Sequence, residues 1–207
     1  ERLHTETSYI PNDITIGKDH QGILLYGVNG VGKSALSKAV GLNVVLAQMG
    51  MYVPSKEFTY YPYENIFTRI SGEDNIFKGQ SSFVVEMNEL RSILKYSTNR
   101  SLVLGDEVCK GTEDSSATAL VSSAIKRFSK NKVNFIFATH LHKLYELDLI
   151  KKINNVKFMH LDIKYDEKLN EIIYGRKLKE GIGESIYGIE IAKYILDDNE
   201  FIKNATE

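Results

Sequence analysis

The feature that most constrains the fold is a glycine-rich segment at residues 27–34, which reads Gly-Val-Asn-Gly-Val-Gly-Lys-Ser. It follows an apolar run at 22–26 and precedes a helix-like run at 35–49. A buried strand, a G-x-x-x-x-G-K-[ST] loop and a helix in this order are typical of a phosphate-binding loop (P-loop). The glycines let backbone N–H groups point at phosphate oxygens, and the helix start adds partial positive charge. A glycine-rich turn before an ordinary helix is the alternative.

The motif assigns roles to particular side chains. Lys33 is expected to reach the β- and γ-phosphates of ATP, and the Ser34 hydroxyl is expected to bind Mg²⁺. The remaining loop positions expected to contact the nucleotide are Gly27, Asn29, Gly30, Val31, Gly32 and Ala35.

Apolar runs alternate with segments of helical spacing along the chain, which predicts an α/β fold with a mainly parallel sheet covered on both faces, a three-layer sandwich. In such folds ligands lie at the carboxyl ends of the strands. The first helix places Leu36, Val40, Val44 and Ala47 at apolar positions. The predicted strands are 23–26, 66–70, 101–104 and 133–138; the predicted helices are 33–49, 83–96, 115–128 and 185–196.

The flanking segments are predicted to have less regular structure. Residues 1–20 are irregular with a turn at 9–13, residues 71–82 form a loop, and strands 156–165 and 172–178 form a hairpin around 166–170. Residues 198–207 are predicted to be a polar tail.

Composition limits the class of protein. The 207 residues are enough for one well-buried domain, and the net charge of −1 argues against a nucleic-acid-coating surface on this segment. A single cysteine, Cys109, allows no intrachain disulfide, which fits a reducing, intracellular compartment. No stretch approaches the length of a transmembrane helix, so no membrane is expected. The polar start without Met suggests a fragment of a larger protein.

A second chemical motif follows about 70 residues after Lys33, where the apolar run 101–104 ends in Gly-Asp-Glu. This spacing fits the metal-side strand of a P-loop ATPase. Asp106 is expected to hold Mg²⁺ and Glu107 to activate or orient the attacking water. The alternative is a solvated strand end that carries no chemistry.

His140 closes the run 133–138 at the same predicted sheet edge and could hydrogen-bond the γ-phosphate. A lone histidine is more often structural, and His4, His20 and His160 are interpreted that way. His142 is predicted to begin a loop or helix.

Residues 79–83, Gly-Gln-Ser-Ser-Phe, open the helix predicted at 83–96. Ser81 with the backbone N–H groups there could bind an anion, or Ser81 or Ser82 could cap the helix with Glu86 in a capping box. One ATP needs one P-loop, so Ser81 is predicted to serve the nucleotide of another subunit.

These motifs, in this order, resemble the ATPase domain of the MutS DNA mismatch-repair proteins, a branch of the ABC-type ATPases. The resemblance runs from about Tyr9 to Leu196, and the run F-V-V-E-M at 83–87 and D-E-x-x-x-G-T at 106–112 are its most specific parts. The segments that carry it are 9–14, 27–34, 66–76, 79–87, 101–107, 110–112, 137–140 and 185–189.

The resemblance implies an ABC-like fold, an ATPase activity that needs Mg²⁺, and site roles. Tyr9 and Ile10 would sandwich the adenine, Ser81 would be the signature serine that reaches the partner's γ-phosphate, and His140 would sense the γ-phosphate. The domain would form a homodimer or a MutS-type heterodimer, and mismatched DNA would be bound by other domains of the full-length protein. The isolated domain is expected to hydrolyse ATP slowly and bind DNA poorly.

The sequence departs from the family pattern at two places. Val28, Gly30, Val31 and Ala35 replace the usual loop residues Pro, Met, Gly and Thr, without removing a phosphate or metal ligand. Glu113-Asp114 replaces the usual Ser-Thr and adds negative charge near the expected interface; the resulting Gly-Thr-Glu run resembles the divergent subgroup of plant organelles, octocoral mitochondria and giant viruses. Cytoplasm, nucleus, mitochondrion and viral factory are not distinguished.

Two other functions stay open at this point. One is an ABC-type head of a chromosome-organising or recombination protein, although such heads carry long coiled-coil insertions. The other is a nucleotide-gated dimerisation module without useful turnover, against which Glu107 argues. A phosphotransferase is more distant, since no lid or acceptor-binding segment is apparent in the sequence.

Overall fold

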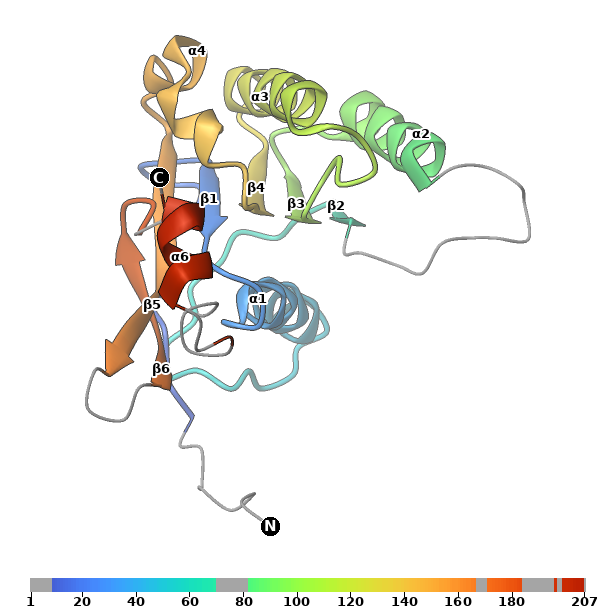
Figure 1. Cartoon of the computed structure of the whole chain (residues 1–207). Helices are drawn as coiled ribbons and strands as arrows, with labels where there is room; N and C mark the ends of the chain where they lie inside the picture. The colour runs from blue at the N-terminus through green and yellow to red at the C-terminus, as the bar shows by residue number, and fades with distance from the viewer. Residues whose placement is uncertain (1–8, 70–81, 167–170, 184–195, 197–198, 207) are drawn as a thin grey trace.

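The computed structural model describes residues 9–69, 82–166, 171–183, 196 and 199–206. They form an α/β fold around a six-stranded sheet with the strand order β2-β3-β4-β1-β5-β6 (Figure 1). The strands are β1 Gly22–Tyr26, β2 Asn65–Arg69, β3 Ser101–Asp106, β4 Asn134–Ala138, β5 Val156–Asp166 and β6 Glu171–Glu180. The helices are α1 Lys33–Gln48, α2 Ser82–Tyr96, α3 Asp114–Lys130, η2 His142–Glu146, α4 Asp148–Lys151 and α6 Asn199–Thr206.

Within the described part of the chain, five strands run parallel, and only β6 runs antiparallel to its neighbour β5. The mainly parallel sheet and its C-terminal hairpin are therefore confirmed. In the centre, Leu25 of β1 lies opposite Ala138 of β4, and Asp106 of β3 lies opposite the same alanine on its other side. The carboxyl ends of β1, β3 and β4 therefore meet at one edge, as the sequence predicted.

The sheet carries a separate hydrophobic core on each face, because successive strand residues alternate between the two. Leu24 and Tyr26 of β1 belong to one core, and Ile23 and Leu25 belong to the other. Helices α2 and α3 cover the first face, and α1 covers the second (Figure 1). We call these the α3 face and the α1 face.

The α3 face has an aromatic centre. Phe128 of α3 contacts Phe135 and Phe137 of β4, with ring centroids 5.7 and 5.9 Å away. The neighbouring strands make room for these rings with glycine. A Cβ on Gly22 would lie 2.1 Å from Phe135, and one on Gly105 would lie 2.7 Å from Phe137.

The α1 face is packed through small residues, which the sequence reading missed. Of the predicted apolar positions Val44 is buried, whereas Leu36, Val40 and Ala47 are only partly covered. The buried row of α1 is Lys33, Ser37, Gly41 and Val44. A Cβ on Gly41 would lie 2.6 Å from Cδ1 of Leu104, so the helix axis approaches β3 as closely as a glycine allows.

The N-terminal segment does not form the predicted turn at 9–13. It runs without regular structure beside β6, where the Asn12 side chain donates to the Arg176 carbonyl at 2.9 Å and accepts from the Leu178 amide at 2.7 Å. These bonds satisfy backbone groups on the outer edge of β6, which explains the extended course.

Residues 199–206, which the sequence described only as part of a polar tail, form helix α6. Ile202 is buried, and Glu200 and Lys203 complement the helix dipole at the two ends. The predicted helix 185–196, apart from residue 196, and the loop 71–82, apart from residue 82, lie outside the described residues, as does Ile70 of the predicted strand. Among the described helices, none has the length and apolar character needed to cross a lipid bilayer.

Candidate functional site

The glycine-rich loop, residues 27–34, leaves β1 at its carboxyl end and leads directly into α1. Gly27, Gly30 and Gly32 have φ angles of 147°, 83° and 112°, which only glycine adopts without strain. Val31 is fully buried, and a Cβ on Gly27 would lie 2.9 Å from its Cγ1. The unusual Val31 thus anchors the loop in the core of the α1 face, beside a glycine that leaves it space.

Lys33 is the most enclosed cation of this region, with 5% of its surface exposed. Its ammonium group donates hydrogen bonds to the carbonyls of Gly27 at 2.6 Å and Val28 at 3.1 Å. Burial lowers the pKa of Lys33, while the negative charges of Glu107 and Asp106 raise it. The lysine therefore sits inside the curl of the loop with two carboxylates close enough to interact with it.

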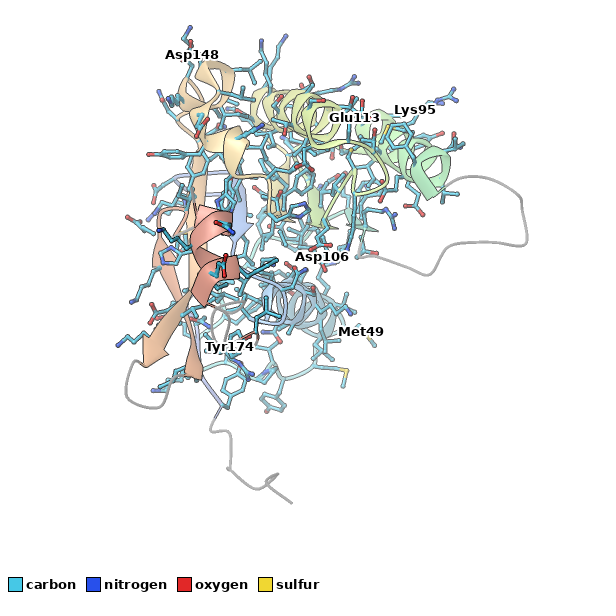
Figure 2. All side chains as sticks on the ribbon, viewed as in Figure 1. Met49, Lys95, Asp106, Glu113, Asp148 and Tyr174 are labelled. Carbon is cyan, nitrogen blue, oxygen red and sulfur yellow. The ribbon has the colours of Figure 1, made fainter. Side chains whose placement is uncertain are left out.

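Asp106 and Glu107 end β3 beside the loop. Asp106 is 5% exposed and lies between α1 and the α2–α3 layer (Figure 2). Glu107 has a φ of 49°, a left-handed conformation that is uncommon outside glycine, and its amide donates to the Ala138 carbonyl at 2.9 Å. The turn directs the chain away from the sheet at this position, as found at many functional sites.

The Glu107 carboxylate, 12% exposed, lies next to Lys110 and His140. The Lys110 ammonium donates to Oε2 at 2.6 Å, and Nδ1 of His140 lies 3.9 Å from Oε1. The hydrogen bond from Lys110 is the main cause that lowers the pKa of Glu107, against an opposing effect of burial. In this conformation Glu107 is an anion held by Lys110.

His140 follows β4 at the same edge, and about half of its side chain is exposed. The preceding Thr139 donates its amide to the Leu25 carbonyl at 3.0 Å, which holds the ends of β4 and β1 together. His142 begins the short helix η2, as predicted, and its ring lies 5.5 Å from that of Tyr26. Burial lowers the pKa of His142, helped by the charges of His140 and Lys33.

The structure therefore brings together Lys33, Asp106, Glu107 and His140, which the sequence predicted as one site. Ser34 lies next to Lys33 in the first turn of α1 and is partly exposed. Tyr9 is 81% exposed, so packing does not explain this residue, and Ile10 beside it is partly covered. Ser81 lies outside the described residues.

Comparison with known proteins places this site in a family. The MutS domain V model matches residues 23–207, nearly the whole chain. The chain belongs to the MutS domain V family. It is 42% identical over 99% of its length to a putative DNA mismatch repair protein, a mutS homologue, of Acanthamoeba polyphaga mimivirus. It is 41% identical over 99% to the mitochondrial DNA mismatch repair protein mutS homolog of Sarcophyton glaucum, and 39% identical over 97% to DNA mismatch repair protein MutS of Finegoldia magna.

This MutS domain corresponds to about a fifth of each of these relatives: 21%, 20% and 23% of their lengths. The sequence reading placed the chain next to giant-virus and octocoral mitochondrial homologues, and relatives from both groups match over nearly all of it.

One part of the MutS domain near the site was missed by sequence reasoning. Glu86 of α2 accepts hydrogen bonds from Nη2 of Arg69 at 3.0 Å and from the Gly111 amide at 3.3 Å. The capping box considered from the sequence stays a prediction, because Ser81 lies outside the described residues. Arg69 also pairs with Glu89, 2.8 Å from Nε to Oε2. The run F-V-V-E-M contains this glutamate, but no local pattern shows that it binds residues from two other elements.

The unusual pair Glu113-Asp114 has a local role in the structure. Glu113 is the N-cap of α3, and its carboxylate accepts hydrogen bonds from Ser116 at 2.9 Å and Thr112 at 3.1 Å. Asp114 adds negative charge to the first helical turn, where the helix dipole favours it. Glu113 and Asp114 therefore also form the start of α3.

Proposed function

We propose that this chain is the Mg²⁺-dependent ATPase domain of a MutS-type DNA mismatch repair protein, with a P-loop at residues 27–34 and an ABC-like arrangement. The observation that carries the proposal is the position of Lys33, buried in a loop of three positive-φ glycines and interacting with Asp106 and Glu107. A buried ammonium group needs anionic partners, and a triphosphate supplies them. The names of the relatives support the repair role.

The residues present fit Mg²⁺. Ser34 offers a hydroxyl and Asp106 a carboxylate, and oxygen ligands of this kind suit a hard divalent cation. Among the described residues, none forms a hydrogen bond or an ion pair with the Asp106 side chain, which leaves its oxygens available. The bound metal would neutralise phosphate charge and orient the nucleotide.

The side chains of this domain would divide the remaining work. Lys33 would exchange its two carbonyl acceptors for phosphate oxygens, and the backbone N–H groups of the loop would bind further oxygens. Glu107 would orient the attacking water and take its proton, and His140, 3.9 Å from it, would donate to the γ-phosphate. Tyr9, whose side chain is exposed, would stack on the adenine with Ile10.

The same proposal extends to assembly. Two such domains would pair so that each ATP lies between the P-loop of one subunit and Ser81 of the other. ATP binding would favour the paired state, because only that state gives the γ-phosphate contacts from both subunits. DNA would be bound by other parts of the complete protein, and the near-zero charge of this domain is consistent with that division.

The test uses Glu107→Gln in the complete protein that contains this domain. The amide keeps the size of the side chain but cannot accept a proton, so we expect turnover to fall at least about a hundredfold while Mg-ATP stays bound. Dimers should accumulate with ATP, as measured by light scattering. Unaltered turnover in this variant would contradict the proposal that Glu107 activates the attacking water.

One observation favours a second candidate, a nucleotide-gated dimerisation module without significant turnover. Lys110 holds Glu107 at 2.6 Å, so the carboxylate is not free in this conformation. The two candidates separate in the same experiment. A wild-type protein that binds Mg-ATP and dimerises, but releases no phosphate above the Glu107→Gln level, is this module.

A further inference from the structure

The loop that carries Glu107 is attached to α2 by a small buried cluster. The loop, residues 107–111, has two non-glycine residues in the left-handed region, Glu107 and Cys109 at φ 49° and 67°. Such a path is unfavourable for the chain by itself and persists only where neighbours fix it. The fixing contacts therefore determine where the Glu107 carboxylate lies.

Two of these contacts come from α2. Glu86 is 7% exposed and accepts the Gly111 amide at 3.3 Å. Gly111 also packs on the helix backbone: a Cβ there would lie 3.0 Å from the Phe83 amide nitrogen and 3.1 Å from its Cα. The far end of the loop thus rests directly on the first turn of α2.

The carboxylate of Glu86 is itself held in place. Arg69 donates to its other oxygen at 3.0 Å, and this arginine ends β2, paired in register with Gly105 next to Asp106. The arginine side chain is 15% exposed, so the ion pair between Arg69 and Glu86 is shielded from water. This shielding strengthens the attraction between the two charges. Buried Cys109 lies in the same environment, where burial and then the Glu86 charge raise its pKa to about 11.

We propose that Glu86 is a positioning residue for Glu107: through Gly111 it fixes the loop 107–111 against α2, with Arg69 holding its carboxylate. The inference rests on the proposed function, because it assigns a role in hydrolysis. It makes the ATPase rate depend on α2 while leaving nucleotide binding to the glycine-rich loop and α1.

The experiment compares Glu86→Gln with the matched control Glu89→Gln in the complete protein. Both glutamates contact Arg69, but Glu89 is about half exposed and has no contact with Gly111 in the described structure. In Glu86→Gln one carbonyl oxygen remains for two donors, and an NH₂ group faces one of them. Displacement of a water-activating group by a fraction of an ångström lowers kcat by about tenfold to a hundredfold.

For Glu86→Gln we expect this loss of kcat, about tenfold to a hundredfold, whereas KM for Mg-ATP should stay within about twofold of wild type. Glu89→Gln should keep both values within about twofold, since its exposed ion pair contributes little. A purely structural role would instead lower the amount of active protein and leave its kcat unchanged, so active sites are counted by bound nucleotide.

Gly111→Ala is the second variant, for the case in which Glu86→Gln does not fold. Its added Cβ would press on Phe83 and displace the loop without removing any charge. The same fall in kcat at constant KM supports the proposal. Wild-type kcat in either folded variant overturns it. Glu107→Gln is measured in parallel: turnover that does not need Glu107 contradicts the proposed function, whereas a need for Glu107 but not Glu86 contradicts this inference alone.

Discussion

The two faces of the sheet are built by different means. The α3 face buries large aromatic rings: Phe137 packs edge to face against Phe128 and Phe135, and those two rings are tilted against each other. The α1 face brings a helix close to β3 through Ser37 and Gly41. The first arrangement buries much apolar area, while the second fixes the start of α1, where Lys33 lies. We infer that stability comes mainly from the α3 face and site geometry mainly from the α1 face.

The largest expected effect is on the α3 face. Phe128→Ala removes a fully buried ring, and such changes lower the free energy of unfolding by about 3–5 kcal/mol. Urea unfolding measures the loss. At a temperature where the variant is still folded, its KM for Mg-ATP should match the wild type. A clearly weakened nucleotide affinity in the folded variant would show that the α3 face also shapes the site.

Lys33→Met is the converse change on the α1 face. It removes the buried charge but keeps most of the length of the side chain, so Mg-ATP affinity should fall about a hundredfold, or about 2.7 kcal/mol. Because burial lowers the pKa of Lys33, the folded state disfavours its charge. The variant should be at least as resistant to urea as the wild type. Unchanged affinity by calorimetry would contradict the role of this lysine.

Gly41→Ala tests the close approach of α1. The added Cβ would lie 2.6 Å from Leu104, and overpacking of this kind costs about 1–3 kcal/mol, partly offset by better helix propensity. We expect a net loss of about 1 kcal/mol in unfolding free energy together with weaker Mg-ATP binding. Ala39→Ser on the exposed side of α1 is the control and should change neither by more than about 0.5 kcal/mol. A stability loss without weaker binding would separate the helix position from the site.

The smallest expected effect is on the pH dependence of stability, and it concerns His20 next to β1, a strand that contributes to both cores. Burial, helped by the Lys157 charge, lowers the pKa of His20, just before β1. In the unfolded chain His20 binds a proton below about pH 6.5, whereas in the folded state it binds this proton only at lower pH. The contribution of His20 to the free energy of unfolding is therefore complete above about pH 6.5 and is lost as the pH falls toward its pKa in the folded state. Urea unfolding of His20→Gln should show a weaker fall than the wild type between about pH 7 and pH 5. An identical slope would assign the acid sensitivity to other groups, such as His142.

The sequence predicted those features that depend on residues close together in the chain. The loop 27–34 and the Asp106-Glu107 strand end are local patterns, and the rule that parallel strands end at one edge was enough to join them with His140. The sheet and the C-terminal hairpin followed from the alternation of apolar runs.

The features it missed depend on tertiary contacts or on small residues. Hydrophobic periodicity gives no weight to Ser37 and Gly41, which pack because they are small. The link from Glu86 to Gly111 joins residues 25 positions apart, and no spacing rule predicts it. Helix α6 was missed because the segment 198–207 is mostly polar and contains only two large apolar residues, which is too few for a helical pattern. One of the two, Ile202, is buried.

Calorimetric titration of Mg-ATP into the wild type and into Glu107→Gln decides whether this arrangement of residues is an ATPase site. We expect both proteins to bind Mg-ATP with measurable heat, and only the wild type to release phosphate afterwards. An absence of heat with the wild type would contradict the nucleotide site built from Lys33, Asp106 and Glu107, and equal phosphate release by both proteins would contradict the ATPase activity.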